Sequence, residues 1–229
     1  MYILLSPAKT FNKTYLEGSR PLYFINETNY LLKHLQTKSL DEIKTIFKTS
    51  DNLSLEILNY YKDFNSRKKA ISLYGGIVYQ SLEFNYLNYD NIYIFSALYG
   101  LLNANTSISE YRLDFTNKIL DQSLYNYWGK KIDSFIKTNL NDKIIINLAS
   151  NEFSKLIDLT NPNVYTIEFL VLKNGKVTKP SYLIKQMRGL FAKDIINKNI
   201  NAIDELSKIE LDGFKFKSIS KQKLTFIKE

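Results

Sequence analysis

The sequence predicts a mixed α/β fold, in which helices surround a central mixed sheet that contains antiparallel hairpins. Short apolar stretches of strand length alternate along the chain with longer amphipathic stretches, as strands and helices that share one core do. Two hairpin patterns in the C-terminal half argue against a purely parallel sheet. No repeat and no low-complexity linker divides the pattern, so residues 1–229 are expected to form one domain.

The N-terminal half begins with a short strand over residues 2–5, which stops at Ser6-Pro7 and leads into a polar loop over 10–20. Ser39 and Glu42 have the spacing of a capping box, in which each side chain bonds the other residue's free backbone amide. A second buried strand, rich in β-branched residues, is expected at 92–95. Amphipathic spacing predicts three helices between the loop and this strand, near residues 26–37, 40–48 and 52–63.

The C-terminal half begins with a helix over 122–138, followed by a nearly continuous apolar strand over 143–148. Asn174-Gly175 favours a type I′ turn and therefore predicts a hairpin at that point. The other expected elements are strands 164–173 and 176–179 on either side of this turn, a helix near 182–197, and a final hairpin of strands 214–219 and 223–228.

Composition excludes several kinds of chemistry. With no cysteine, the chain has no disulfide, no thiolate metal site and no cysteine nucleophile. Its one histidine, His34, cannot build a multi-histidine metal centre and is expected on the polar side of a helix. Neither a metal nor a cofactor is predicted. No apolar stretch is long enough to span a membrane and the start lacks a basic leader, so a cytoplasmic protein without a membrane partner is expected.

The basic charge is weaker evidence for nucleic-acid binding than its size suggests. The net charge is 31 − 23 = +8, but 27 of the 31 cations are lysine, a bias typical of an AT-rich genome. The charge is uneven, with +2 over residues 1–120 and +6 over 121–229. Lysine attracts phosphate as a point charge and reads bases poorly, so any DNA binding is predicted to be independent of sequence.

The informative residues follow the three buried strands. In a sheet with helical crossovers the carboxyl ends of the strands face a shared crevice where ligands bind. Small hydroxyl groups, a lysine and a glycine collected there predict an anion-binding pocket. The candidates at these strand ends are Ser6, Lys9, Thr10, Tyr99, Gly100, Asn147, Ser150 and Glu152. Ser6 with Lys9 also has the Ser-x-x-Lys spacing of a serine nucleophile, although the second signature of such enzymes is missing, and Ser6-Pro7 could simply end a strand.

Glycines and arginines add further candidates. Gly75 and Gly76 lie between helical stretches and fit either a plain turn or a helix-hairpin-helix that brings backbone close to phosphate. Arg112 could bind a ligand or form a buried ion pair with Asp114 or Glu110.

Arg188-Gly189 interrupts a helical pattern, where glycine costs roughly 1 kcal/mol relative to alanine, so close packing or a close approach is expected. Trp128 and most of the tyrosines are assigned to the core.

The sequence motifs together resemble the YaaA family of bacterial peroxide-stress proteins from Met1 to about Ile200. The motifs that carry the resemblance are Leu5-Ser6-Pro7-Ala8-Lys9-Thr10, Ser96-Ala97-Leu98-Tyr99-Gly100-Leu101-Leu102, Tyr111-Arg112-Leu113, Leu124-Tyr125 with Trp128-Gly129, Ile146-Asn147-Leu148-Ala149-Ser150-Asn151-Glu152, and Arg188-Gly189-Leu190. The resemblance implies a cytoplasmic protein that limits peroxide damage and free intracellular iron. It also implies an unusual α/β fold with a helix-hairpin-helix element, and a positively charged cleft that binds double-stranded DNA. It implies no established catalytic activity.

The chain departs from the family pattern at two of these motifs. Asn103-Ala104 stands where the family usually has Arg-Pro, which removes a cation expected beside the cleft. The usual Ala-Ser-Asp-Glu-Tyr is replaced at residues 149–153, where Asn151 and Phe153 lack the carboxylate and the phenol, so a role that needs the aspartate is in doubt. The tail after Gly213 is also shorter than the family pattern predicts.

Two functions of different classes remain open on the sequence. The leading hypothesis is sequence-independent binding of double-stranded DNA by a basic crevice made of Lys9, Arg112, Lys185 and Arg188. The alternative is an enzyme that acts on a nucleotide or modified base, with Glu152 as general acid or base and a nucleotide-like small molecule as partner. Direct iron sequestration is disfavoured, because the chain offers almost only carboxylate ligands.

Overall fold

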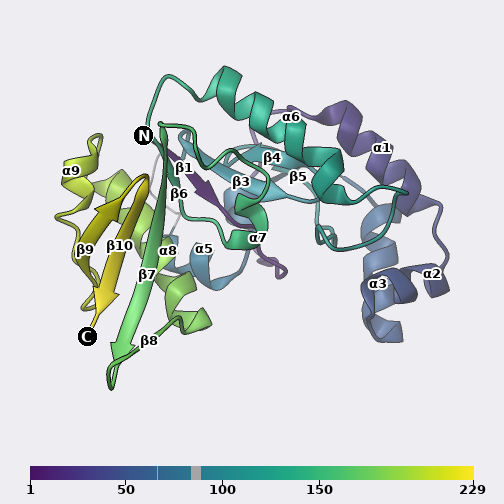
Figure 1. Ribbon diagram of the computed structural model, residues 1–229. Helices are drawn as coiled ribbons and strands as arrows, with labels where there is room; N and C mark the ends of the chain where they lie inside the picture. Colours follow the sequence, from purple (N-terminus) through teal and green to yellow (C-terminus); the bar gives the residue numbers. More distant parts are fainter. Residues whose placement is uncertain (66, 84–88) are drawn as a thin grey trace.

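One mixed sheet organises the molecule (Figure 1), and it contains strands from both ends of the chain. The computed structural model describes residues 1–65, 67–83 and 89–229. In order across the sheet, its strands are β4 (Gly100–Asn103), β3 (Ile92–Ser96), β1 (Tyr2–Leu5), β6 (Ile145–Asn147), β7 (Val164–Lys173), β10 (Lys223–Lys228) and β9 (Lys215–Ser220), with β8 (Lys176–Thr178) paired to β7.

The middle of the sheet is parallel and its margins are antiparallel, which confirms the predicted mixed fold. Strands β3, β1, β6, β7 and β10 pair in parallel with one another, in that order across the sheet. Strands β4, β8 and β9 each pair antiparallel with the strand next to them. Leu5 of β1 lies opposite Ile94 of β3, and Leu4 lies opposite Asn147 of β6. The carboxyl ends of these three strands therefore lie at one edge of the sheet.

Helices cover both faces of the sheet. Tyr93 of β3 contacts Phe135 of α6, with 5.9 Å between ring centroids, whereas Phe169 of β7 contacts Phe191 of α8 at 5.6 Å. The strand register places these contacts on opposite faces. The helices are α1 (Ile25–Gln36), α2 (Leu40–Phe47), α3 (Asp51–Lys62), α4 (Ala70–Leu73), α5 (Ile77–Leu82), α6 (Leu124–Asn139), α7 (Asn151–Ser154), α8 (Ser181–Asn197) and α9 (Ile203–Leu206).

The long predicted elements all form, and their ends either coincide with the predicted ones or differ by at most two residues. The capping box at the start of α2 forms as predicted from Ser39 and Glu42. The sequence interpretation missed β4, the short helix α9, and a small separate sheet of β2 (Lys68–Lys69) and β5 (Ser107–Ile108). It expected helical stretches on either side of Gly75-Gly76, where α4 and α5 form. In the part of the chain that is described, no helix combines the length and the apolar character that crossing a membrane requires.

The turn from β3 into β4 explains why β4 was missed. Gly100 has φ +79°, a left-handed conformation that glycine adopts without strain, and it folds the chain back antiparallel onto β3. A Cβ atom at Gly100 would stand 2.6 Å from the Trp128 ring. Trp128 is fully buried, and its indole N–H donates to the Ala97 carbonyl at 2.8 Å, which confirms the predicted core role.

Helices α5 and α8 pack unusually closely at Gly189. A Cβ atom there would clash with the carbonyl oxygen of Val78 and lie 2.8 Å from the Cβ of Ser81, both on α5. Close packing therefore accounts for the glycine within this helix, as the sequence predicted. The contact places the neighbouring side chain, Arg188, beside the strand ends.

Gly189→Ala is expected to lower the free energy of unfolding by about 1–3 kcal/mol, because the backbone of α5 must move to admit the methyl group. Urea denaturation measures the change. The matched control is Gly129→Ala in α6, where no heavy atom lies within 4 Å of the added carbon. That control should raise stability by up to about 1 kcal/mol through helix propensity, so equal effects at both glycines would contradict the packing explanation.

Candidate functional site

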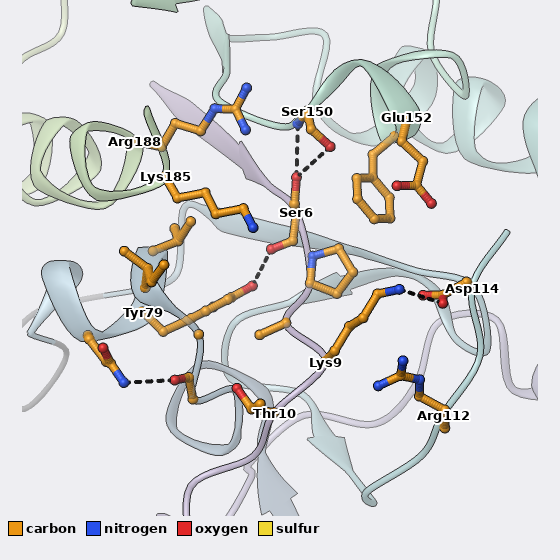
Figure 2. A pocket seen from close by; sticks show the side chains of 18 of the residues that line it. Ser6, Lys9, Thr10, Tyr79, Arg112, Asp114, Ser150, Glu152, Lys185 and Arg188 are labelled. Carbon is orange, nitrogen blue, oxygen red and sulfur yellow. Dashed lines mark hydrogen bonds and ion pairs between the residues drawn. The ribbon is translucent and has the colours of Figure 1, made fainter. Parts of the chain in front are cut away.

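A cavity of about 510 Å³ lies at the carboxyl end of β1 (Figure 2) and is called the inner cavity below. Four segments and one helix bring side chains to it. They are residues 6–10 after β1, residues 75–80 at the start of α5, residues 111–114, the start of α7, and Lys185 with Arg188 on α8. A crevice at the strand ends was predicted, and the parallel pairing of β1 and β6 produces it.

Ser6 joins three of these elements. Its hydroxyl oxygen accepts a hydrogen bond from the backbone N–H of Ser150 at 2.9 Å, which ties the end of β1 to the start of α7. Its carbonyl oxygen accepts a bond from the Tyr79 hydroxyl at 2.7 Å, which ties β1 to α5. Burial raises the pKa of Tyr79 well above its usual range, so this phenol stays a neutral donor. Ser6 therefore fixes the floor of the inner cavity.

Lys9 does not activate Ser6. Its ammonium group forms an ion pair with Asp114 at 2.6 Å, and the side chain points toward Asp114 and away from Ser6 (Figure 2). The Ser6 hydroxyl instead interacts with Ser150. The serine–lysine arrangement that the Ser-x-x-Lys spacing suggested is not formed. Lys9 and Thr10 both remain exposed at the cavity, where an anion can reach them.

Gly75 and Gly76 line the inner cavity, and their lack of side chains lets the loop after β1 pack against them. A Cβ at Gly76 would lie 2.8 Å from the Cβ of Ala8, and one at Gly75 would lie 2.8 Å from the Asn12 side-chain oxygen. The Gly75 N–H already donates to the Thr10 carbonyl at 2.8 Å. The glycines lie between α4 and α5, which have four and six residues. A phosphate-binding helix-hairpin-helix at this point stays a prediction.

Arg188 carries a buried hydrogen-bond donor that no described residue satisfies. Its side chain is half-buried, and its Nε is fully buried with no hydrogen-bond partner within the described residues. Burial lowers the pKa of the guanidinium from its usual value, yet arginine stays protonated in proteins. Lys185 lies one turn earlier on α8, is exposed, and lines the same cavity (Figure 2). A buried donor without a partner costs about 1–3 kcal/mol, so Arg188 is held beside the cavity with a hydrogen-bonding group that the described residues do not satisfy.

Arg112 does not form the ion pair that the sequence left open. Asp114 is paired with Lys9, and Glu110 is paired with Lys68 at 2.9 Å. The Arg112 carbonyl accepts a hydrogen bond from the buried Tyr61 hydroxyl, which fixes this loop. Its guanidinium has no ion pair with any side chain whose placement is described, and it lines the inner cavity. The ligand-binding alternative for Arg112 is therefore the one that the geometry leaves open.

Glu152 is the second residue of α7 and lines the inner cavity across from Arg188 (Figure 2). Burial and the nearby Asp114 raise the pKa of its carboxyl, while Lys9 and Lys155 act in the opposite direction. The start of a helix favours the ionised form of a carboxyl group. Burial has the larger effect, so Glu152 holds a proton more readily than an ordinary glutamate.

Three predicted site residues do not reach the inner cavity. Tyr99 is buried, and its hydroxyl donates to the Ser109 carbonyl at 3.1 Å. Gly100 packs on Trp128. The side-chain amide of Asn147 donates to Ser154 at 3.0 Å and to Thr166 at 3.1 Å. Placing these residues at the crevice was wrong, because β3 turns straight back into β4 and Asn147 points into the sheet–α7 interface.

The departure at residues 103–104 has no effect on the cavity. Asn103 is buried at the end of β4, where its amide donates to the Asp90 carbonyl at 2.8 Å, and Ala104 is fully buried. Neither lines the inner cavity. The cation expected beside the cleft would therefore have stood elsewhere in the fold. The other departure does reach the site, since Phe153 lines the inner cavity.

A second, wider space adjoins the first and is called the outer groove. It has a volume of about 1110 Å³ and shares Ser150, Glu152, Lys185 and Arg188 with the inner cavity. It adds Lys179, Lys221 and Lys223 from the C-terminal part of the chain. Glu168 binds Lys179 at 2.7 Å and Lys223 at 3.7 Å. The sequence predicted a basic C-terminal half, but charge counts alone could not show which lysines converge.

Several residues of the inner cavity had not been predicted as site residues from the sequence. Tyr79 is one of them, because a tyrosine in an apolar stretch looks like any core residue. Asp114 had been considered only as an ion-pair partner of Arg112, and Phe153 only as a departure from the family motif. Tyr111 also lines the cavity and is bonded to Tyr74 and Ser96, at 2.8 Å in each case.

The fold and the site define a mixed α/β protein with a basic cleft at the carboxyl ends of its parallel strands. The chain belongs to the family described as peroxide stress protein YaaA, whose model matches residues 1–220. This membership supports a role in peroxide stress and confirms the resemblance that the motifs suggested.

Related proteins align along nearly their whole length. A UPF0246 protein of Fusobacterium nucleatum is 35% identical over 97% of this chain and 96% of its own. A UPF0246 protein of Malacoplasma penetrans is 32% identical over 99% and 98%. A third, from Clostridioides difficile, is 32% identical over all of both chains.

Glu152→Gln is expected to raise the melting temperature at about pH 7, since the fold favours the protonated carboxyl and its ionised form costs stability. The difference should disappear at about pH 3, where the wild-type carboxyl is also protonated. Glu168→Gln is the matched control with the opposite sign. Its hydrogen bond with Lys179 lowers the pKa of Glu168, so the substitution should lower the melting temperature at pH 7 and lose its effect as pH falls. Equal signs for the two variants would refute the assignment.

Proposed function

We propose that this YaaA-family protein limits peroxide damage by binding double-stranded DNA through its basic cleft, without sequence preference. The observation that carries the proposal is Arg188, a half-buried guanidinium with an unpartnered Nε at the junction of the inner cavity and the outer groove. Phosphate oxygens satisfy a guanidinium with two hydrogen bonds as well as charge. Lys185 and Arg112 supply further positive charge at the same cavity.

The outer groove supports contact with a long polyanion rather than with a single small ion. Lys179, Lys221 and Lys223 extend the positive charge away from Arg188. Exposed lysines bind phosphate as point charges and do not discriminate between bases. Binding of this kind is dominated by release of counterions from DNA and depends steeply on salt.

Protection of DNA would limit iron-dependent damage without itself lowering the amount of free iron. With no cysteine and one histidine, the chain lacks the usual ligands for iron. Bound protein that covers the duplex would instead limit the access of iron and peroxide to it. This step is part of the proposal and rests on DNA binding.

Arg188→Ala is expected to weaken DNA binding by about tenfold to a hundredfold, because it removes one charge-assisted hydrogen-bonding group worth about 1.5–3 kcal/mol. The log–log salt slope should become shallower by about 0.9 for each phosphate that the variant no longer neutralises. Fluorescence anisotropy with two duplexes of unrelated sequence measures both quantities, and the two sequences should respond alike.

The matched control is Arg67→Ala, because Arg67 is exposed and lines neither the inner cavity nor the outer groove. It should change affinity by less than about threefold, in line with a surface charge remote from the DNA. Affinity that hardly falls between about 50 and 200 mM salt, or equal losses of affinity in the two variants, would count against the cleft as the DNA-binding site.

One observation favours a second function, which is catalysis on a nucleotide or modified base. Glu152 combines a raised pKa with a place on a partly enclosed cavity, as a general acid requires. Nucleotides and oligonucleotides that carry oxidised bases would be incubated with the protein and followed by mass spectrometry. This function predicts turnover that Glu152→Gln abolishes and Glu168→Gln preserves, since Glu168 lines only the outer groove. An absence of turnover with every substrate would leave binding as the function.

A further inference from the structure

Two spaces of different shape meet at the same pair of cations. The inner cavity holds about 510 Å³, and the outer groove about 1110 Å³. Arg188 and Lys185 line both of them. Small-molecule pockets typically have about 300–1,000 Å³, so the inner cavity has the size of a site for one compact ligand. A DNA duplex is far too wide to enter it.

Charge is distributed unequally around the inner cavity. Lys185 and Arg188 lie on one side, and no acidic side chain among the described residues forms an ion pair with either (Figure 2). On the opposite side lie the carboxyl groups of Glu152 and Asp114 together with two cations, Arg112 and the Lys9 that is paired to Asp114, so the formal charges on that side balance. A ligand with one anionic end and one neutral, hydrogen-bonding end fits this arrangement. A second anionic group would meet no net positive charge on that opposite side.

Between the two charged sides the walls are largely apolar. Pro7, Leu113 and Phe153 line the cavity, and Phe153 is half-buried. The ring of Phe95 stacks on Phe153 with 6.1 Å between centroids and 24° between planes, which holds Phe153 in place. Aromatic rings of this kind stack on nucleobases without regard to sequence. A phosphate, a flat ring and a polar ring edge are the three parts of a nucleotide that such a cavity can recognise.

We infer that the inner cavity takes up one nucleotide displaced from the DNA, with its phosphate on Arg188 and Lys185 and its base beside Phe153. The inference rests on the proposed DNA binding and specifies which part of the DNA the cavity receives. The flanking duplex remains in the outer groove on Lys179, Lys221 and Lys223. The carboxyl groups of Glu152 and Asp114 face the polar edge of the base.

Unpairing a base has a free-energy cost that is smaller at a mismatch than in a regular duplex, so such a protein should prefer DNA with an unpaired nucleotide. The ratio of affinities for a duplex with one mismatched 2-aminopurine and for its fully paired counterpart is expected to be on the order of ten. Fluorescence of the 2-aminopurine should change on binding, because the base leaves the stack.

Ile77→Trp tests the cavity itself. Ile77 is the first residue of α5, is half-buried and lines the inner cavity, so an indole there would occupy the space. The affinity ratio should fall to about one and the 2-aminopurine signal should disappear. Ile25→Trp is the matched control, because Ile25 is also the first residue of a helix, is 46% exposed, and lines neither space. It should keep both the ratio and the signal.

Phe153→Leu provides a second test that does not depend on filling the cavity. It keeps an apolar side chain but removes the stacking face, and should reduce the affinity ratio by about tenfold toward one. Circular dichroism and melting curves confirm that each variant is folded before it is compared.

The outcomes distinguish the nucleotide inference from the DNA-binding proposal. Equal affinity for paired and mismatched duplexes with no fluorescence change would overturn the nucleotide inference and leave DNA binding intact. No binding of any duplex would overturn both. Binding of a free nucleoside 5′-monophosphate without binding of DNA would also overturn the inference and would favour the enzymatic alternative.

Discussion

The cleft depends on how the end of β1 is held at Ser6. The parallel pairing of β1 with β3 and β6 brings the chain to the edge of the sheet. This pairing ends at Leu5, so it does not determine the backbone conformation of the residues that follow. Ser150 donates to the Ser6 hydroxyl oxygen and Tyr79 donates to the Ser6 carbonyl oxygen. These two bonds fix α7 and α5 relative to β1. The close approach of α8 to α5 at Gly189 then sets the position of Arg188.

These contacts explain why the cations of the cleft are not equivalent. Lys9 lies on the loop after β1 and already has Asp114 as a partner, so binding an anion there means competing with an existing ion pair. Arg188 comes from a helix held at Gly189, and its Nε has no such partner in the described part of the chain. Residue type and local pattern alone do not rank Arg188 above Lys9 as the site of anion binding. The geometry makes Arg188 the stronger candidate, because its buried donor is uncompensated and its position is fixed.

The sequence predicted the architecture well where a residue pattern has one structural meaning. Apolar strands at 92–95 and 143–148, the Asn174-Gly175 turn and the capping box at Ser39 are local features, and each forms. Tyr99 and Gly100 were misplaced because a strand end and a tight reversal into a new strand look alike in one dimension. Only the packing of Gly100 on Trp128 distinguishes them. Similarly, Gly75 and Gly76 meet the loop after β1, a contact between segments far apart in the chain that no local pattern reveals.

Nearly all the cations of this chain are lysine, and there is a physical reason why residue 188 is arginine instead. At a half-buried position, desolvation disfavours the charged form, and a lysine ammonium responds by losing its proton readily. A guanidinium is weakly hydrated, delocalised and still charged after its pKa has been lowered by burial. Lysine serves in the outer groove, where Lys221 and Lys223 are exposed to water. Arginine suits a position where the cation must remain charged while half-buried between the inner cavity and the outer groove, and Arg188 occupies this position.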